Sequence, residues 1–220
     1  MNDELYEQFK NMKIPADIKP LEPFTRESLT KELKRKIDIK RTLVISLNTG
    51  TFRPNEVHIH TADIGSTYEP DFDFSDLNEF DAWRKTCRLK FNLQRFENVD
   101  AVRCEGFLHK MQICESLTLF EEVHRMLKKE SWFLISVYDL FKLIKEISIF
   151  SPIDMNKLYH YEKLLFSAGD STGVYYNRTF WTFERLEYYL KMAKFSSVEK
   201  VDNDNKYTLS VKATKINSSL

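Results

Sequence analysis

Glycine, proline, cysteine and net charge are all scarce in this sequence of 220 residues. It contains 5 Gly, 6 Pro and 3 Cys, and 33 Lys and Arg balance 33 Asp and Glu. The low Gly and Pro content excludes a collagen-like or linker chain, and 42% hydrophobic with 14% aromatic residues excludes a mainly disordered one. Without net charge, no overall field attracts the chain to nucleic acids or acidic membranes. We therefore expect a globular protein whose contacts with polyanions are local.

The sequence also lacks the patterns that indicate disulfides, metal sites or membrane spans. The cysteines Cys87, Cys104 and Cys114 are odd in number and lack CxxC spacing, so we predict three buried thiols and no metal site. The chain opens without a charged and then apolar signal region, and no apolar run approaches membrane-spanning length. These absences predict a cytoplasmic protein without a membrane partner.

Residues 1–40 are predicted to form an N-terminal helical extension, with a charged helix over 26–36 capped by Thr25. The basic residues Lys34-Arg35-Lys36 and Lys40-Arg41 could touch phosphate, but such a run beside a helix is usually a solvated face. Nucleic-acid binding is therefore the weakest hypothesis for this chain.

Residues 41–216 alternate between strand and helix patterns and are predicted to form one domain. Strands are predicted over 42–47, 57–60, 99–104, 132–137, 197–201 and 207–213, and helices over 76–86, 115–128, 140–149, 154–166 and 183–194. The apolar run 42–47 is typical of a strand covered by helices on both faces. A helix leading directly into a strand indicates a parallel sheet, and the polar turn 202–205 indicates a final antiparallel hairpin. The predicted class is thus α/β.

Several motifs occur in the same order as these elements. They are Leu47-Asn48-Thr49-Gly50-Thr51-Phe52, Phe96 to Val102, Phe120 to Lys129, Val137-Tyr138-Asp139-Leu140 and Phe180 to Leu186. Over about residues 42–215 the sequence resembles the small class I S-adenosylmethionine-dependent methyltransferases, particularly those found near glycan and capsule biosynthesis. The resemblance implies a Rossmann-like, mostly parallel sheet. Where that family has Pro-Gly-Gly and a late glycine, this chain has Lys129-Glu130-Ser131 and Lys194.

The resemblance also implies S-adenosylmethionine as cofactor, with candidate contacts at Asn48, Gly50, Asp63, Asn92, Leu93 and Glu105. Gly50 would let the backbone turn sharply beside the ligand, whereas Phe52 replaces a glycine and would fill part of the pocket unless its ring points outward. Asp63 would accept hydrogen bonds from ribose hydroxyls, although an Asp after a strand is more often a turn or cap residue. For the adenine, spacing favours Asn92-Leu93 over Asp76-Leu77.

Methyl transfer requires a nucleophile held in line and a group that removes its proton. His109 and Asp139 are the candidate bases, although a single His near a strand end is more often structural. By analogy the acceptor is a small hydroxyl-bearing molecule or a sugar, with Tyr175, Tyr176 and Trp181 as possible pocket aromatics or plain core. The alternative is an inactive descendant that binds a protein partner, and Phe52 together with the missing glycines favours it.

Overall fold

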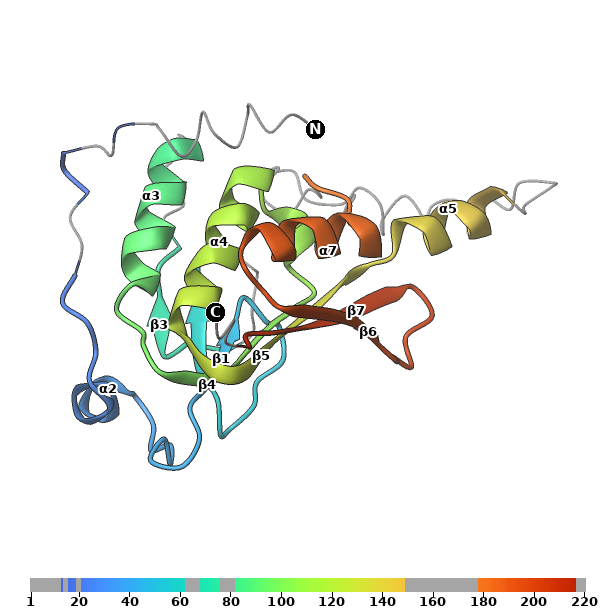
Figure 1. Ribbon diagram of the computed structural model, residues 1–220. Coiled ribbons are helices and arrows are strands. Elements are labelled where there is room, and N and C mark those ends of the chain that lie inside the picture. Colours follow the sequence, from blue (N-terminus) through green and yellow to red (C-terminus); the bar gives the residue numbers. More distant parts are fainter. Residues whose placement is uncertain are drawn as a thin grey trace.

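The computed structural model describes residues 13, 16–18, 21–61, 68–75, 82–148 and 178–216 (Figure 1). Its helices are α2 (Arg26–Glu32), α3 (Ala82–Leu93), the 3₁₀ turn η1 (Leu108–Lys110), α4 (Ile113–Met126), α5 (Leu140–Ser148) and α7 (Phe183–Met192). Its strands are β1 (Val44–Leu47), β2 (Val57–His60), β3 (Phe72–Asp73), β4 (Val99–Glu105), β5 (Leu127–Tyr138), β6 (Ser197–Val201) and β7 (Thr208–Thr214). The short strand β3 was not predicted, α3 ends later than predicted, and the predicted helix 154–166 lies outside the described residues, as does the predicted start of the helix at 76.

The seven strands form one sheet in the order β3-β2-β1-β4-β5-β7-β6. Strands β1 to β5 pair in parallel, whereas β7 runs antiparallel to β5 and β6 antiparallel to β7. This arrangement confirms the predicted Rossmann-like α/β class with a C-terminal antiparallel hairpin. The chain moves outward from β1 to β3 and then returns to the other side of β1, which places the topological switch point between β1 and β4.

One face of the sheet carries the hydrophobic core. Helices α3, α4 and α7 lie side by side over this face (Figure 1). The side chains that alternate along the central strands, such as Ile45, Leu47 and Val102, are fully buried in one cluster with Phe120 of α4. Each such side chain contributes about 1.5–3 kcal/mol when it leaves water, so this layer dominates the stability of the domain.

The opposite face of the sheet is polar across its centre. Ser46, His58 and Arg103 are direct cross-strand partners on β1, β2 and β4. Because side chains alternate between the faces of a strand, these three point away from α3, α4 and α7. The expectation that helices cover both faces of the 42–47 strand is therefore wrong for the described part of the chain.

Helix α2 begins as predicted at Thr25, whose hydroxyl accepts a hydrogen bond from the Ser28 N–H at 3.0 Å. It ends at Glu32, four residues before the predicted end. Leu29 and Leu33 belong to the same core cluster as the sheet, together with Ile39. The described part of the N-terminal segment is therefore packed into the domain.

Two of the missing glycines leave a mark on the backbone. Glu130 and Lys194 have φ angles of +62° and +72°, in the left-handed region that favours glycine. Both stand where the resembling family has glycine, after α4 and after α7. Both residues therefore hold a backbone conformation that glycine would adopt at lower cost.

The described ranges contain no helix that is both long enough and apolar enough to cross a membrane.

Candidate functional site

The carboxyl ends of β1, β4 and β5 bring several of the candidate residues to one edge of the sheet. Asn48 and Gly50 follow β1, Glu105 ends β4, and Asp139 follows β5, while His109 lies in η1 just beyond β4. This edge includes the switch point between β1 and β4, where open α/β sheets bind ligands. Asp63 would follow β2 at the same edge but lies outside the described residues.

Residues 48–56 connect β1 to β2 without a helix, and we call them the β1–β2 loop. Parallel strands are usually joined by a crossover of a dozen or more residues that contains a helix. Asn48 begins the loop with a φ angle of +48° and is 1% exposed. Its side chain donates to the Thr61 hydroxyl at 2.6 Å and accepts from the Thr61 N–H at 2.7 Å. Asn48 therefore ties the end of β1 to the end of β2.

The glycine expected to make the sharp turn does not make it. Gly50 has no positive φ, and a Cβ added there would meet nothing within 4 Å. The left-handed turn falls on Asn48, a residue type that tolerates this region, and Gly50 stays a predicted point of close approach to a ligand. Of the two glycines in the described residues, Gly106 has a φ angle of +74°, and a Cβ added there would also meet nothing within 4 Å. Its position directly after an apolar strand was the signal that sequence analysis missed.

Phe52 points outward onto the polar face of the sheet. Its ring stacks on His58 with 5.1 Å between centroids, and the Arg35 guanidinium lies 4.8 Å from its centre. The side chain remains 46% exposed. The outward orientation, one of the two alternatives for this residue, is therefore the one observed.

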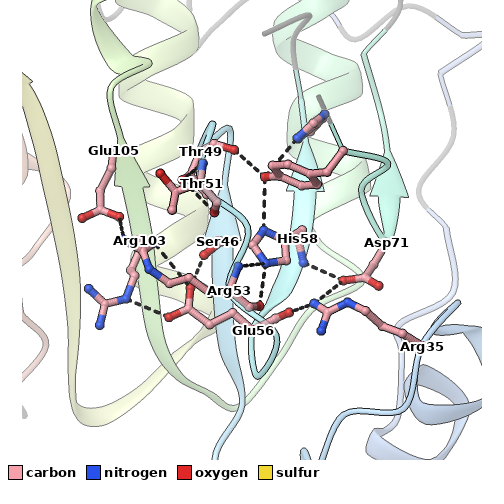
Figure 2. Close-up of polar contacts among 12 residues, drawn as sticks. Arg35, Ser46, Thr49, Thr51, Arg53, Glu56, His58, Asp71, Arg103 and Glu105 are labelled. Atoms are coloured by element: carbon pink, nitrogen blue, oxygen red, sulfur yellow. Dashed lines mark hydrogen bonds and ion pairs between the residues drawn. The ribbon is translucent and has the colours of Figure 1, made fainter. Parts of the chain in front are cut away.

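A row of alternating charges crosses the polar face from β4 to the β1–β2 loop (Figure 2). Arg103 Nε donates to Glu56 Oε1 at 3.0 Å, and the other oxygen of Glu56 lies 3.7 Å from Arg53 Nη1 and accepts the Ser46 hydroxyl. Arg53 Nη2 then forms an ion pair with Glu105 Oε2 at 2.5 Å. Glu105, a predicted cofactor contact, is thus paired with an arginine of the loop.

One atom of this ion pair lacks a hydrogen bond. Arg53 Nη1 is buried and makes no hydrogen bond among the described residues, although it lies 3.7 Å from Glu56 Oε2. Glu105 Oε2 is the atom that pairs with Arg53 Nη2, so its charge is compensated. A buried donor without a hydrogen bond costs about 1–3 kcal/mol. The pair thus joins the β1–β2 loop to the end of β4 at some cost in stability.

His109 is 4% exposed, and its Nδ1 is buried without a hydrogen-bond partner among the described residues. Its ring lies 4.7 Å from that of Tyr138 at the end of β5. Burial, followed by the charge of Lys110, lowers the pKa of His109 to about 3. The imidazole is therefore neutral at pH 7 and available as a hydrogen-bonding group, but it is a weak base.

Asp139 is used as a helix cap. Its Oδ1 accepts from the Lys142 N–H at 3.1 Å at the start of α5, and Lys142 Nζ lies 3.8 Å from Oδ2. Its backbone forms an isolated bridge with Trp181, whose buried Nε1 has no hydrogen-bond partner. Asp139 thus lies at the expected edge with its carboxylate already engaged.

The structure does not bring Asn92 and Leu93 to this edge. They end α3, just before β4 begins, and so lie at the amino edge of the sheet. Leu93 is fully buried, and its carbonyl accepts from Arg125 at 3.0 Å. The alternative pair, Asp76-Leu77, and the aromatics Tyr175 and Tyr176 lie outside the described residues.

The three cysteines are buried free thiols, as predicted. Burial, followed by the neighbouring charge of Glu105, raises the pKa of Cys104 to about 12. The thiol therefore stays protonated, which argues against a nucleophilic role. Within the described ranges, no group of three or more His, Cys, Asp or Glu side chains is arranged to hold a metal ion.

The described part of the edge fits S-adenosylmethionine in part. The open space at Gly106 and the unpartnered Nδ1 of His109 are features that a bound ligand would fill and satisfy. The β1–β2 loop, in contrast, offers no helix N-terminus and no glycine turn toward a ligand.

No family model matches the chain, and no curated protein matches it. Many solved structures are similar to it, and three of them serve as examples. An S-adenosylmethionine-dependent methyltransferase from Archaeoglobus fulgidus is 12% identical over 79% of this chain and 86% of its own, with a TM-score of 0.48. A possible exported protein from Bordetella parapertussis is 14% identical over 99% and 80%, with a TM-score of 0.46. An O-methyltransferase family protein from Burkholderia thailandensis is 13% identical over 81% of this chain, with a TM-score of 0.44.

This chain spans 52% of the length of the Burkholderia protein. Identities of 12–14% and TM-scores below 0.5 do not determine an activity. The strand order and the edge residues of the chain itself therefore carry the functional argument.

Proposed function

We propose that the protein is an S-adenosylmethionine-dependent methyltransferase that acts on a small hydroxyl-bearing acceptor or a sugar. The observation that carries the proposal is the switch point itself: β1 and β4 end side by side in a sheet of order β3-β2-β1-β4-β5-β7-β6. The methyltransferase-like motif Leu47-Asn48-Thr49-Gly50 follows β1 at this place. The glycan-related acceptor class rests on the sequence resemblance alone.

The cofactor, when bound, supplies an electrophilic methyl group. On the protein side, Thr49, Gly50 and Glu105 would line the cofactor where β1 and β4 end, and Asp63 would accept hydrogen bonds from its ribose. His109 would orient the acceptor hydroxyl through Nδ1, which has no other partner. Because methylation makes the acceptor oxygen strongly acidic, even an imidazole of low pKa can take up its proton. The engaged carboxylate of Asp139 makes it the second choice for this step.

A second candidate function is that of a non-catalytic binding module with the same fold. Two observations favour it. The Arg53–Glu105 ion pair joins the β1–β2 loop to the end of β4 beside the switch point, and α5 exposes Phe141 and Ile144, which are 62% and 50% exposed. Exposed large apolar side chains on one helix are typical of a protein-binding surface.

Calorimetric titration with S-adenosylmethionine and S-adenosylhomocysteine separates the two candidates. We expect micromolar binding that is lost in Asp63→Ala and kept in Asp202→Ala, a matched control in the exposed β6–β7 turn. Binding of about 10 μM corresponds to about −7 kcal/mol, well within calorimetric detection. No heat and no thermal shift at millimolar ligand would overturn the methyltransferase proposal and leave the binding module.

A further inference from the structure

His58 of β2 lies at the centre of the polar face, 1% exposed, and connects the sheet to the β1–β2 loop (Figure 2). Its backbone N–H donates to Asp71 Oδ2 at 2.9 Å. Its ring lies between Tyr68 and Arg53, with Nδ1 3.2 Å from the Tyr68 hydroxyl and Nε2 3.0 Å from the Arg53 backbone nitrogen. The Tyr68 hydroxyl in turn donates to the Thr49 carbonyl. Both ends of the imidazole are therefore directed at the loop.

The ring nitrogens of His58 have partners that fit both neutral tautomers. Nε2 lies 3.0 Å from the Arg53 backbone nitrogen and 2.8 Å from the Arg53 carbonyl oxygen, so it either accepts from the N–H or donates to the carbonyl. Nδ1 lies 3.2 Å from the Tyr68 hydroxyl, which donates to the Thr49 carbonyl. Burial lowers the pKa of His58, which favours the neutral imidazole at pH 7.

Arg35 holds the far end of the loop. Its guanidinium donates to the carbonyls of Pro54 and Glu56 and pairs with Asp71 at 3.0 Å. The basic run 34–36 is thus no solvated helix face at Arg35, which corrects the sequence-based expectation. We call Arg35, His58 and Tyr68 the loop clamp.

The loop clamp has a physical reason. A helix satisfies most of its backbone groups internally, whereas a helix-free crossover needs partners from elsewhere. Within the loop the structure gives Thr51 N–H donating to the Thr49 hydroxyl and Glu56 N–H donating to the Arg53 carbonyl. The clamp supplies partners at Thr49, Arg53, Pro54 and Glu56, and thereby fixes Arg53 opposite Glu105.

We propose that His58 and Tyr68 are positioning residues that hold the β1–β2 loop in place for the amino-acid end of the cofactor. The inference rests on the proposed function. In that function Asp63, after β2, binds the ribose, so the homocysteine end of the ligand extends toward β1 and β4. Thr49 and Arg53, the loop residues fixed by the clamp, lie on that side.

The test uses Tyr68→Phe, which removes the hydroxyl but keeps the ring that packs on Phe52, His58 and His60. The matched control is Tyr188→Phe on the exposed side of α7, in the other layer of the domain. Hydrogen exchange of residues 48–56 reports the loop in the ligand-free chain. Calorimetry with S-adenosylhomocysteine and with 5′-methylthioadenosine, which lacks the amino-acid end, reports the ligand.

We expect loop exchange to accelerate about tenfold and S-adenosylhomocysteine to bind about fivefold more weakly in Tyr68→Phe, the effect of one lost hydrogen bond. Methylthioadenosine affinity and the control variant should not change. His58→Gln keeps an acceptor for the Arg53 N–H, so it should restore part of the S-adenosylhomocysteine affinity that is lost in His58→Ala. A merely structural loss would instead weaken the binding of both ligands alike.

Four results would overturn the inference. Unchanged loop exchange in Tyr68→Phe and His58→Ala would show that these residues do not hold the loop. A faster loop with unchanged S-adenosylhomocysteine affinity, or equal losses for both ligands, would show that the loop does not serve the amino-acid end. If the unaltered chain binds neither ligand, the proposed function fails, and the ligand role of His58 and Tyr68 fails with it.

Discussion

The two crossovers that flank the switch point are held in different ways. Between β4 and β5 the chain passes through α4, whose Phe120 and Val123 are fully buried against the sheet. Between β1 and β2 it passes through the helix-free β1–β2 loop, which Arg35, His58 and Tyr68 hold by directed polar contacts. The same parallel connection is thus achieved once by apolar burial and once by hydrogen bonds.

The difference shows what each kind of contact provides. Apolar burial is non-directional and large, at about 1.5–3 kcal/mol for each fully buried side chain. A hydrogen bond contributes only about 1 kcal/mol net, but it fixes a particular atom in a particular place. The α4 crossover therefore stabilises the domain, whereas the β1–β2 loop places individual groups such as Arg53 at the site.

The largest expected effect is on the α4 side. Phe120→Ala should lower the free energy of unfolding by about 3–5 kcal/mol, because it leaves a cavity between α4, Phe133 and Trp181. Urea denaturation followed by circular dichroism measures it. The control is Phe52→Ala on the loop, where a half-exposed ring should cost about 1 kcal/mol or less. Similar losses in the two variants would remove the distinction between the crossovers.

An intermediate effect is expected for Asp71, whose side chain is 3% exposed and serves both Arg35 and His58. Asp71→Asn should cost about 2–3 kcal/mol in urea denaturation, because it leaves the Arg35 charge without its partner. Asp73→Asn is the matched control two residues away, since within the described part of the chain the carboxylate of Asp73 accepts hydrogen bonds only from Ser75. A cost below that of the control would mean that the polar contacts add no stability to the loop.

The smallest expected effect is the loss of unfolding free energy that His109 causes at pH 6. His109 lies at the start of the α4 crossover. The pKa of His109 is about 3 in the folded chain and about 6.5 when unfolded, so both states are neutral above pH 6.5. As the pH falls below 6.5 the unfolded state binds a proton that the folded state does not, and stability decreases. The loss due to His109 should reach about 2 kcal/mol at pH 5.

His109→Gln should remove this part of the dependence, measured as the slope of unfolding free energy between pH 6.5 and 5. Comparing slopes avoids any constant cost of the substitution itself. Equal slopes for the variant and the unaltered chain would show that His109 binds a proton as readily in the folded chain as in the unfolded one, and so that burial does not lower its pKa.

Local patterns in the sequence predicted most of the elements. The apolar stripe of α4 and the cap Thr25 were correct, because helix periodicity and capping depend on neighbours three or four residues apart. Strand β5 begins at Leu127, which pairs with Val99 of β4, rather than at 132. The polar residues that follow have no register partner in β4, and Glu130 and Ser131 bond instead to the backbone of Lys215, a contact distant in sequence. The adenine assignment to Asn92-Leu93 followed spacing and did not account for the direction in which α3 crosses the sheet.

In the candidate site, too, one part could be predicted from local patterns and another part could not. The sequence alone indicated that Asn48, Glu105, His109 and Asp139 follow strands, because apolar runs and the polar residues after them can be read locally. Only the tertiary structure decided what their side chains do: Asn48 joins Thr61, Asp139 caps α5, and Glu105 pairs with Arg53. The loop clamp joins residues 35, 58 and 68, whose contacts form only when the sheet, the loop and the N-terminal segment pack together, and no local periodicity encodes them.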